Sequence, residues 1–185
     1  MITRLINDIN AALDAEAYIS ALALALTLPD TCGKAEYPDL KTKERYLKWY
    51  EEYIGQHERY PVEEGEIENP YLSAEVVYQL RCNLLHQGTI DVEKEKIEEE
   101  CCQIDNFILI TESAKSPAIY PDASSVLISE NEISRGYRVN VRRLCFLLTR
   151  MATVYYEKNK DKFTFLKINI LNWDEEIKKM YAIRK

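Results

Sequence analysis

Histidine is scarce in this chain, and several motifs that would identify a common enzyme class are absent. Only His57 and His86 occur among 185 residues. The sequence has no glycine-rich phosphate-binding loop and no Ser-His-Asp arrangement. It therefore carries no signature of a P-loop nucleotide-binding protein or of a serine hydrolase.

The cysteines do not have the spacing of zinc ligands, and their number is odd. Because only two histidines are present to complete such a site, we expect no metal ion and no cofactor. We interpret the cysteines as reduced thiols of a cytoplasmic protein. For the adjacent pair in the middle of the chain a redox role stays open beside simple packing, which we favour. The five residues are Cys32, Cys82, Cys101, Cys102 and Cys145.

Long apolar runs and an excess of basic charge are also missing. The most apolar stretch, residues 17–28, has about 12 residues, whereas a helix that crosses a bilayer needs about 20. The first 28 residues carry Asp8, Asp14 and Glu16 in place of the basic start of a signal peptide. The 31 acidic and 24 basic residues give a net charge of −7, which argues against a general nucleic-acid coat. We therefore expect a cytoplasmic protein without a membrane partner, in which any RNA contact is local.

The order of hydrophobic patterns predicts a single domain, residues 1–185, that is mainly α-helical and α+β overall. We expect a helical bundle with a small inserted antiparallel β-sheet. The helical core should comprise residues 1–88 and 140–160, and the β insertion residues 103–139. A strand and a helix are expected within residues 163–185.

Within that plan, proline, glycine and asparagine predict where elements end or begin. An apolar N-terminal helix should stop at Pro29 and be followed by an irregular connection, and Asn140 should cap a long helix. The other predicted elements are a helix with an aromatic side at 41–54, strands at 104–110 and 126–129, a returning strand at 136–140 and a final strand at 163–171.

Residues 71–88, YLSAEVVYQLRCNLLHQG, predict the amphipathic helix around which the functional interpretation is built. Ser73 is a suitable N-cap, and Gly88 stands where a glycine commonly follows a helix. Near the C-terminal end the apolar pattern is interrupted by Arg81, Asn83 and His86.

Arg81 and His86 have the residue types needed to cleave a phosphodiester without a metal ion. At about 100° per residue they are roughly 140° apart around the helix, but the long arginine side chain allows both to reach one anion beside the last turn. His86 could move the proton of a 2′-hydroxyl, Arg81 could stabilise the charge of the transition state, and Asn83 could orient either group. The alternative is structural: Arg81 in an ion pair with Glu75 or Glu36, and His86 as a helix C-terminal residue.

The sequence RCNLLH, with four residues between Arg81 and His86, resembles the R-x4-6-H signature of the HEPN superfamily, and the surrounding stretch is similar to bacterial HEPN-like proteins. The resemblance covers about residues 1–160. It implies a helical, usually dimeric domain in which Arg81 and His86 of both subunits face a shallow cleft at the two-fold interface. Many such domains are metal-independent RNases of toxin–antitoxin, phage-defence and RNA-processing systems.

The resemblance therefore implies a metal-independent endoribonuclease that acts by 2′-hydroxyl transesterification on single-stranded RNA, as a homodimer that an antitoxin or another partner protein could control. Cys82 stands where the family usually has a polar residue. This departure leaves open a non-catalytic HEPN-like dimeric module that binds RNA or protein. A purely structural dimer joined through the apolar first helix is a third alternative.

One cationic cluster stands out in this acidic chain: four arginines surround an aromatic residue just before and within the predicted helix after Asn140. Such a group could hold a single-stranded phosphate backbone. It could equally pair with the acidic run at residues 93–100. The predicted RNA-binding residues are Arg135, Tyr137, Arg138, Arg142 and Arg143.

Overall fold

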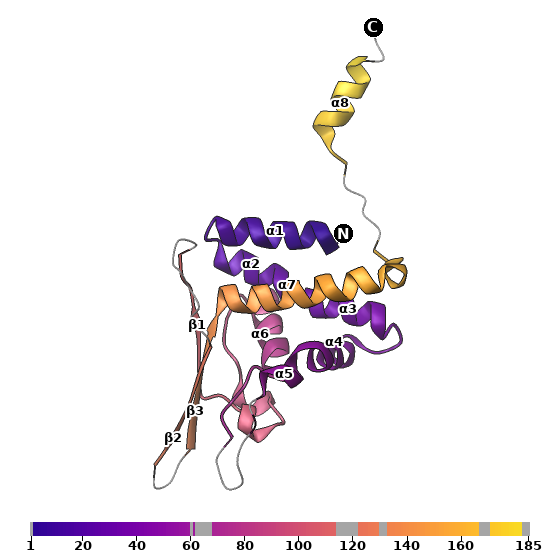
Figure 1. The fold of residues 1–185 in the computed structure, drawn as a ribbon. Helices are drawn as coiled ribbons and strands as arrows, with labels where there is room; N and C mark the ends of the chain where they lie inside the picture. Colours follow the sequence, from indigo (N-terminus) through magenta and orange to yellow (C-terminus); the bar gives the residue numbers. More distant parts are fainter. Residues whose placement is uncertain are drawn as a thin grey trace.

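The computed structural model describes residues 2–59, 61, 68–113, 122–129, 133–166 and 171–182. Figure 1 shows a body of packed helices with a narrow three-stranded sheet along one side. The prediction of a mainly α-helical, α+β protein is confirmed. Among the described helices, none has both the length and the apolar character needed to span a membrane.

Three helices form the N-terminal part: α1 (Ile2–Asp14), α2 (Tyr18–Ala25) and α3 (Leu28–Glu36). The prediction of one helix that stops at Pro29 before an irregular connection is wrong. Pro29 lies in the first turn of α3, where no backbone N–H is required, so it begins a helix instead of ending one. Gly33 allows α3 to approach α4 closely, because a Cβ there would lie 2.6 Å from the Arg45 carbonyl oxygen.

The aromatic helix predicted at 41–54 is confirmed as α4 (Thr42–Tyr50), continued by a π-helical turn η1 (Glu51–Gly55) and the single turn α5 (Gln56–Glu58). Tyr46, Trp49 and Tyr50 are fully buried. Trp49 stacks on Tyr53 at 5.1 Å between ring centroids and meets Tyr155 of α7 edge-on at 5.8 Å. The aromatic side therefore forms the core between α4 and α7.

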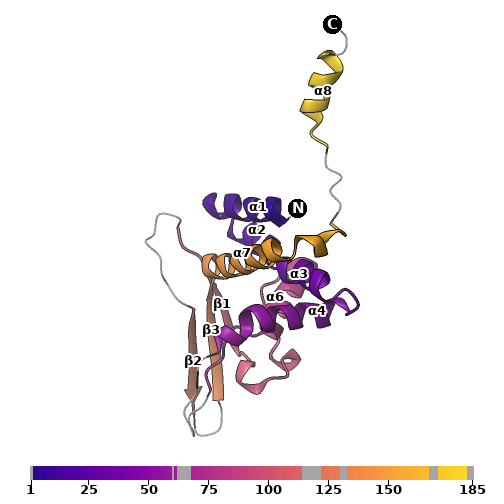
Figure 2. The same ribbon diagram turned by 45° about the vertical axis from the view of Figure 1, so that its right-hand side comes forward.

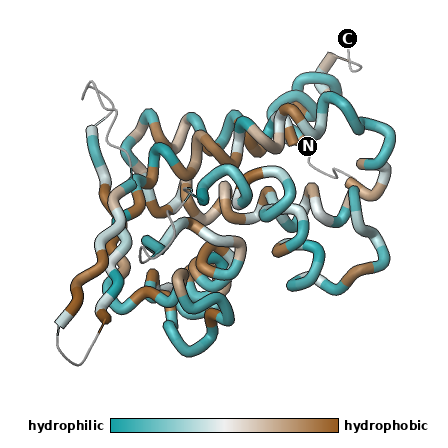
Figure 3. Tube along the Cα trace, turned by 60° about the horizontal axis from the view of Figure 1, so that its bottom comes forward, coloured by the Kyte–Doolittle hydropathy of each residue, from teal (hydrophilic) through white to brown (hydrophobic). Residues whose placement is uncertain are grey.

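Two helices begin at the predicted caps. The hydroxyl of Ser73 accepts from the Val76 N–H at the start of α6 (Ala74–Gln87), and the Asn140 side chain accepts from the Arg143 N–H at the start of α7 (Val141–Lys158). Figure 3 shows that apolar and polar segments follow one another along the helices, and the buried apolar residues of α6 and α7 belong to the core. The cap predictions are confirmed because capping depends only on neighbouring residues.

The sheet contains β1 (Asn106–Ile110), β2 (Ala123–Ile128) and β3 (Ile133–Asn140) in the order β1-β3-β2. All three predicted strands are present, but the prediction of an antiparallel sheet is wrong. Strand β2 is antiparallel to β3, whereas β1 is parallel to β3. Strand β3 follows both others in the chain and lies between them in the sheet. Strand β3 leads directly into α7.

The C-terminal strand predicted at 163–171 is not formed by its described residues 163–166. Phe163 ends the short helical turn η4 (Lys160–Phe163), because its ring packs on Tyr155 and Tyr156 of α7 and turns the chain there. Residues 167–170 lie outside the described residues. The predicted last helix is confirmed as α8 (Trp173–Ala182), which stands away from the helical body and buries none of its residues (Figure 2).

Candidate functional site: the C-terminal end of helix α6

The last two turns of α6 bring Arg81 and His86 into contact. The Nη1 atom of Arg81 lies 3.2 Å from Nε2 of His86. His86 is exposed and Arg81 is half-buried, so the pair is open to solvent on one side. The helix stops directly beyond it at Gly88, whose φ of 71° is the left-handed conformation that glycine adopts without strain. The long arginine side chain thus closes the gap between two positions that do not share a helix face.

The contact joins a permanent donor to a group that can act as an acid or a base. A guanidinium only donates hydrogen bonds, so this contact is a hydrogen bond when Nε2 of His86 carries no proton. The pair therefore places an acid/base group beside a permanent cation.

Arg81 has few competing partners. Its Nη1 also approaches the Cys82 sulfur at 3.7 Å, and its Nε is buried without a hydrogen-bond partner. No carboxylate in the described part of the chain forms an ion pair with it. Glu75 instead accepts from the backbone N–H of Glu98, and Glu36 accepts from Tyr155 and Lys162. The alternative in which Arg81 pairs with Glu75 or Glu36 is therefore not realised.

Asn83 lies on a different side of α6, where it is 5% exposed. Its side-chain amide donates to the Asp91 carbonyl oxygen at 2.7 Å, and its backbone carbonyl oxygen accepts from the Gly88 and Thr89 N–H groups. These contacts hold the chain that leaves the helix. The structure thus places Asn83 against this outgoing segment and brings together only the other two predicted catalytic residues.

The predicted RNA-binding cluster is largely used inside the fold. Arg143 bridges two acidic side chains, with 2.6 Å to Glu58 and 2.6 Å to Asp122. The hydroxyl of the buried Tyr137 donates to the same Asp122 carboxylate at 3.4 Å. Burial raises the pKa of Asp122, and the hydrogen bond from Asn140 and the charge of Arg143 oppose that rise. These residues join α5, the sheet and α7 to one another.

The other arginines of the cluster also differ in accessibility. Arg142 donates to the carbonyl oxygens of Glu112, at 2.9 Å, and Leu13, at 2.8 Å. Arg135 is 8% exposed, and Arg138 is exposed. The arginines thus do not present one cationic surface, and the hydrogen-bond and ion-pair partners of Arg142 and Arg143 lie outside the acidic run at 93–100. Of the four arginines, only Arg138 is exposed and therefore accessible to a nucleic acid.

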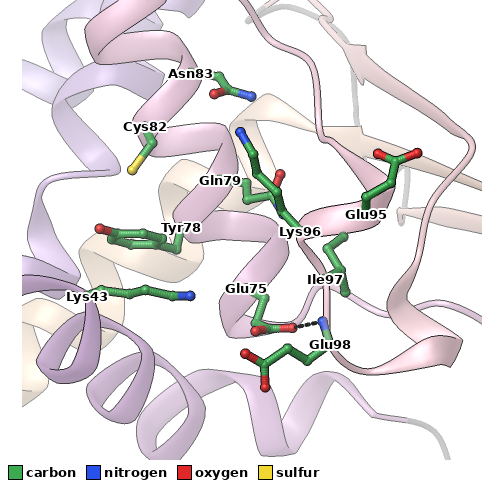
Figure 4. A pocket seen from close by; sticks show the side chains of 10 residues that line it. All are labelled: Lys43, Glu75, Tyr78, Gln79, Cys82, Asn83, Glu95, Lys96, Ile97 and Glu98. Atoms are coloured by element: carbon green, nitrogen blue, oxygen red, sulfur yellow. Dashed lines mark hydrogen bonds between the residues drawn. The ribbon is translucent and has the colours of Figure 1, made fainter.

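A pocket of about 510 Å³ lies beside α6 and was not expected from the sequence. Figure 4 shows Lys43 of α4, Tyr78 of α6 and Lys96 of the following segment around it. Cys82 and Asn83 line it, but Arg81 and His86 do not, because they project from other sides of the helix. The spacing of Glu75, Tyr78, Gln79 and Cys82 by three or four residues is the signal that could have indicated this shared face.

The described residues include one group of three potential metal ligands close together: Glu99, Cys101 and Cys102. Within the described part of the chain, no hydrogen bond or ion pair links this group to Arg81 or His86. All five cysteines of the chain are free.

Fold and site together define a mainly α-helical protein with an exposed Arg–His pair at a helix end. No protein-family model matches the chain, and no curated protein or solved structure matches it. Functional conclusions therefore rest on the chemistry of the site.

Proposed function

We propose that the protein is a metal-independent endoribonuclease of HEPN type in which Arg81 and His86 do the chemistry. The observation that carries the proposal is the 3.2 Å contact between Arg81 Nη1 and His86 Nε2 at an exposed helix end. It joins a permanent cation to an imidazole, the two groups that transesterification of RNA requires.

The reaction follows from these two groups. The neutral His86 takes the proton of a 2′-hydroxyl, and the freed oxygen forms a bond to the neighbouring phosphorus. The bond from phosphorus to the 5′-oxygen breaks, and that oxygen receives the proton back from His86. Arg81 binds the phosphoryl oxygens as charge grows on them. The products carry a 2′,3′-cyclic phosphate and a 5′-hydroxyl.

The same contact explains how Arg81 becomes available to the phosphate. The Nε2 lone pair that accepts from Arg81 is the one that must take the proton of the 2′-hydroxyl, so the guanidinium has to leave Nε2 before proton transfer. It then binds the phosphoryl oxygens, and two cations at this distance repel each other once His86 is protonated. Proton transfer and anion stabilisation are coupled through one hydrogen bond.

The HEPN resemblance supports a homodimer, a toxin or phage-defence role and control by an antitoxin. For RNA, the exposed Arg138 is the member of the predicted cluster that can contact a phosphate without breaking internal bonds. Binding through a limited number of cations agrees with the net charge of −7.

The test is cleavage of a mixed single-stranded RNA pool in EDTA by the wild type, Arg81→Ala and His86→Ala. We expect wild-type cleavage with cyclic-phosphate ends, reduced at least about 100-fold in either variant. His57→Ala is the matched control, because His57 is the only other histidine and is exposed on α5. Cleavage that EDTA abolishes, or that both variants retain, would refute the mechanism.

A second candidate is an RNA- or protein-binding module without catalysis. It is favoured by Cys82, which contacts Arg81 and stands where the HEPN family usually has a polar residue. In this case RNA binding survives His86→Ala and falls in Arg81→Ala, because a phosphate clamp needs charge but no proton transfer. Filter binding with the same variants separates the two candidates. Wild-type binding without any cleavage would select the module.

A further inference from the structure

Glu99, Cys101 and Cys102 meet at the short 3-10 turn η3 (Glu100–Cys102), in the pink segment at the lower end of the helical body in Figure 1. Their ligand atoms all lie within 4.8 Å of one another. The two sulfurs are 3.7 Å apart, and the Cys102 sulfur is 3.8 Å from Oε2 of Glu99. The three side chains thus converge with their potential ligand atoms close together.

These distances match the edges of a zinc coordination tetrahedron. Two sulfurs at about 2.3 Å from a tetrahedral Zn²⁺ lie about 3.8 Å apart, and a sulfur and a carboxylate oxygen lie about 3.5 Å apart. The Cys101–Cys102 separation agrees with the first value, and the Cys102–Glu99 separation is slightly longer than the second. A cation can therefore enter with little movement of the ligands.

The carboxylate is already oriented toward the sulfurs. Its Oε1 atom accepts from the Arg59 guanidinium, and its Oε2 atom accepts from the Tyr71 hydroxyl at 2.8 Å. Oε2 is also the atom that faces Cys102. Ligands held by neighbouring donors in this way are typical of metal sites, because orientation is then established before the ion arrives.

The surroundings of the thiols also suit a bound cation. Cys102 is fully buried and Cys101 is half-buried. Thiolates at such positions are unfavourable unless a positive charge compensates them, and a bound dication supplies that charge.

Solvent reaches the Glu99 end of the group. Glu99 lines an open pocket of about 470 Å³, together with Arg59, Tyr71 and Ser73. The pocket gives an ion access to the carboxylate.

We propose that Glu99, Cys101 and Cys102 bind a thiophilic divalent cation, with Zn²⁺ as the expected metal and water as the fourth ligand. Two thiolates and one carboxylate select Zn²⁺ over Mg²⁺ and Ca²⁺, which prefer oxygen ligands alone. Binding releases the two thiol protons and ties η3 to the segment before α6 through Tyr71. The site is independent of the Arg81–His86 pair, so the two proposals can fail separately.

The test uses the full chain, reduced with a phosphine, freed of metal with a chelator and titrated with Co²⁺. We expect one Co²⁺ per chain, a thiolate-to-cobalt charge-transfer band and displacement by Zn²⁺. Cys101→Ala and Glu99→Gln should each lower Co²⁺ affinity at least about tenfold. Cys82→Ala and Glu100→Gln are the matched controls, because Cys82 is a partly exposed cysteine on α6 and Glu100 is an exposed neighbour outside the ligand set.

We choose Cys101 for replacement because it is half-buried, and we expect Cys101→Ala to fold. Cys102 is fully buried, so its replacement would disturb the core. The proposal fails if the reduced, folded wild type gives no charge-transfer band. It also fails if Cys101→Ala keeps the band, or if Cys82→Ala loses it to the same extent. Because RNA cleavage is measured in EDTA, that experiment reports on Arg81 and His86 alone.

Discussion

At the scale of single residues, partners decide what a polar side chain in α6 can do. Arg81 and Asn83 are two positions apart but differ in their partners. The buried Nε of Arg81 has no hydrogen-bond partner, whereas the side-chain amide of Asn83 donates to the Asp91 carbonyl oxygen. The first side chain is available for a ligand and the second is committed to the fold. Asn83 should therefore contribute to stability instead of to catalysis.

Replacing Asn83 tests this assignment. Asn83→Ala removes the hydrogen bond from the buried Asn83 side chain to the Asp91 carbonyl oxygen, which we expect to lower the free energy of unfolding by about 1 kcal/mol. Gln87→Ala, at an exposed position of the same helix, should change it by less than about 0.5 kcal/mol. Urea unfolding followed by circular dichroism measures both. Unchanged stability together with lost RNA cleavage would instead assign Asn83 to the active site.

At the scale of the element, α6 depends on its end at Gly88, because the left-handed residue turns the chain directly after His86. Nothing lies within 4 Å of a Cβ built at this position, so a substitution there meets backbone strain alone. Gly88→Ala should lower the free energy of unfolding by about 1 kcal/mol. Gly88→Asn should cost less, because asparagine tolerates this conformation. Equal urea midpoints for the two variants would contradict the prediction.

The contact between α3 and α7 makes the free energy of unfolding depend on pH. Hydrogen bonds from Lys162 and Tyr155, both at 2.5 Å, lower the pKa of Glu36 from its ordinary value of 4.5. A lowered pKa in the folded state means that this stabilisation is complete above pH 4.5 and is lost as the pH falls through the folded-state pKa. Glu36→Gln should therefore cost about 1 kcal/mol at neutral pH and almost nothing at about pH 3.

Thermal unfolding of the wild type and Glu36→Gln across this range measures the difference. Glu157→Gln is a suitable control, because Glu157 forms an exposed pair with Lys160, only three positions away in the chain. If the unfolding temperatures of the wild type and Glu36→Gln differed by the same amount at all pH values, ionisation of the Glu36 carboxylate would not be the cause of the pH dependence.

At the scale of the whole molecule, the question is whether one chain supplies both halves of the proposed site. Arg81 and His86 of the same chain are in contact, so a dimer of HEPN type would contain two complete pairs. A dimer formed from one Arg81→Ala chain and one His86→Ala chain has no intact pair within either chain. If each chain works alone, this mixed dimer should be inactive.

Coexpression of the two variants with different tags, followed by purification through both tags, gives the mixed dimer for the RNA-cleavage measurement. If the reaction instead combines Arg81 of one subunit with His86 of the other, one composite site remains in the mixed dimer. About half of the wild-type activity would then return. This result would replace the intrachain arrangement by one shared between subunits.

The sequence by itself determined the features that depend on neighbouring residues: the caps at Ser73 and Asn140, the end of α6 at Gly88 and the strands of the small sheet. The Arg81–His86 contact also belongs here, because the two residues are five positions apart on one helix. Pro29 was misinterpreted even at this range, since a proline that appears to end one helix can occupy the first turn of the next.

Only the tertiary structure decided the parallel pairing of β1 with β3 and the partners of the arginines. Arg143 meets Glu58 from 85 positions away and Arg142 meets Leu13 from 129 positions away, so no local pattern distinguishes these residues from a free cationic surface. The Glu99–Cys101–Cys102 group lacks a recognised zinc spacing, and its ligands converge because the chain turns at η3 and Tyr71 orients the carboxylate. Distant contacts fix these side chains, because burial leaves each charged group only the partners that packing brings to it.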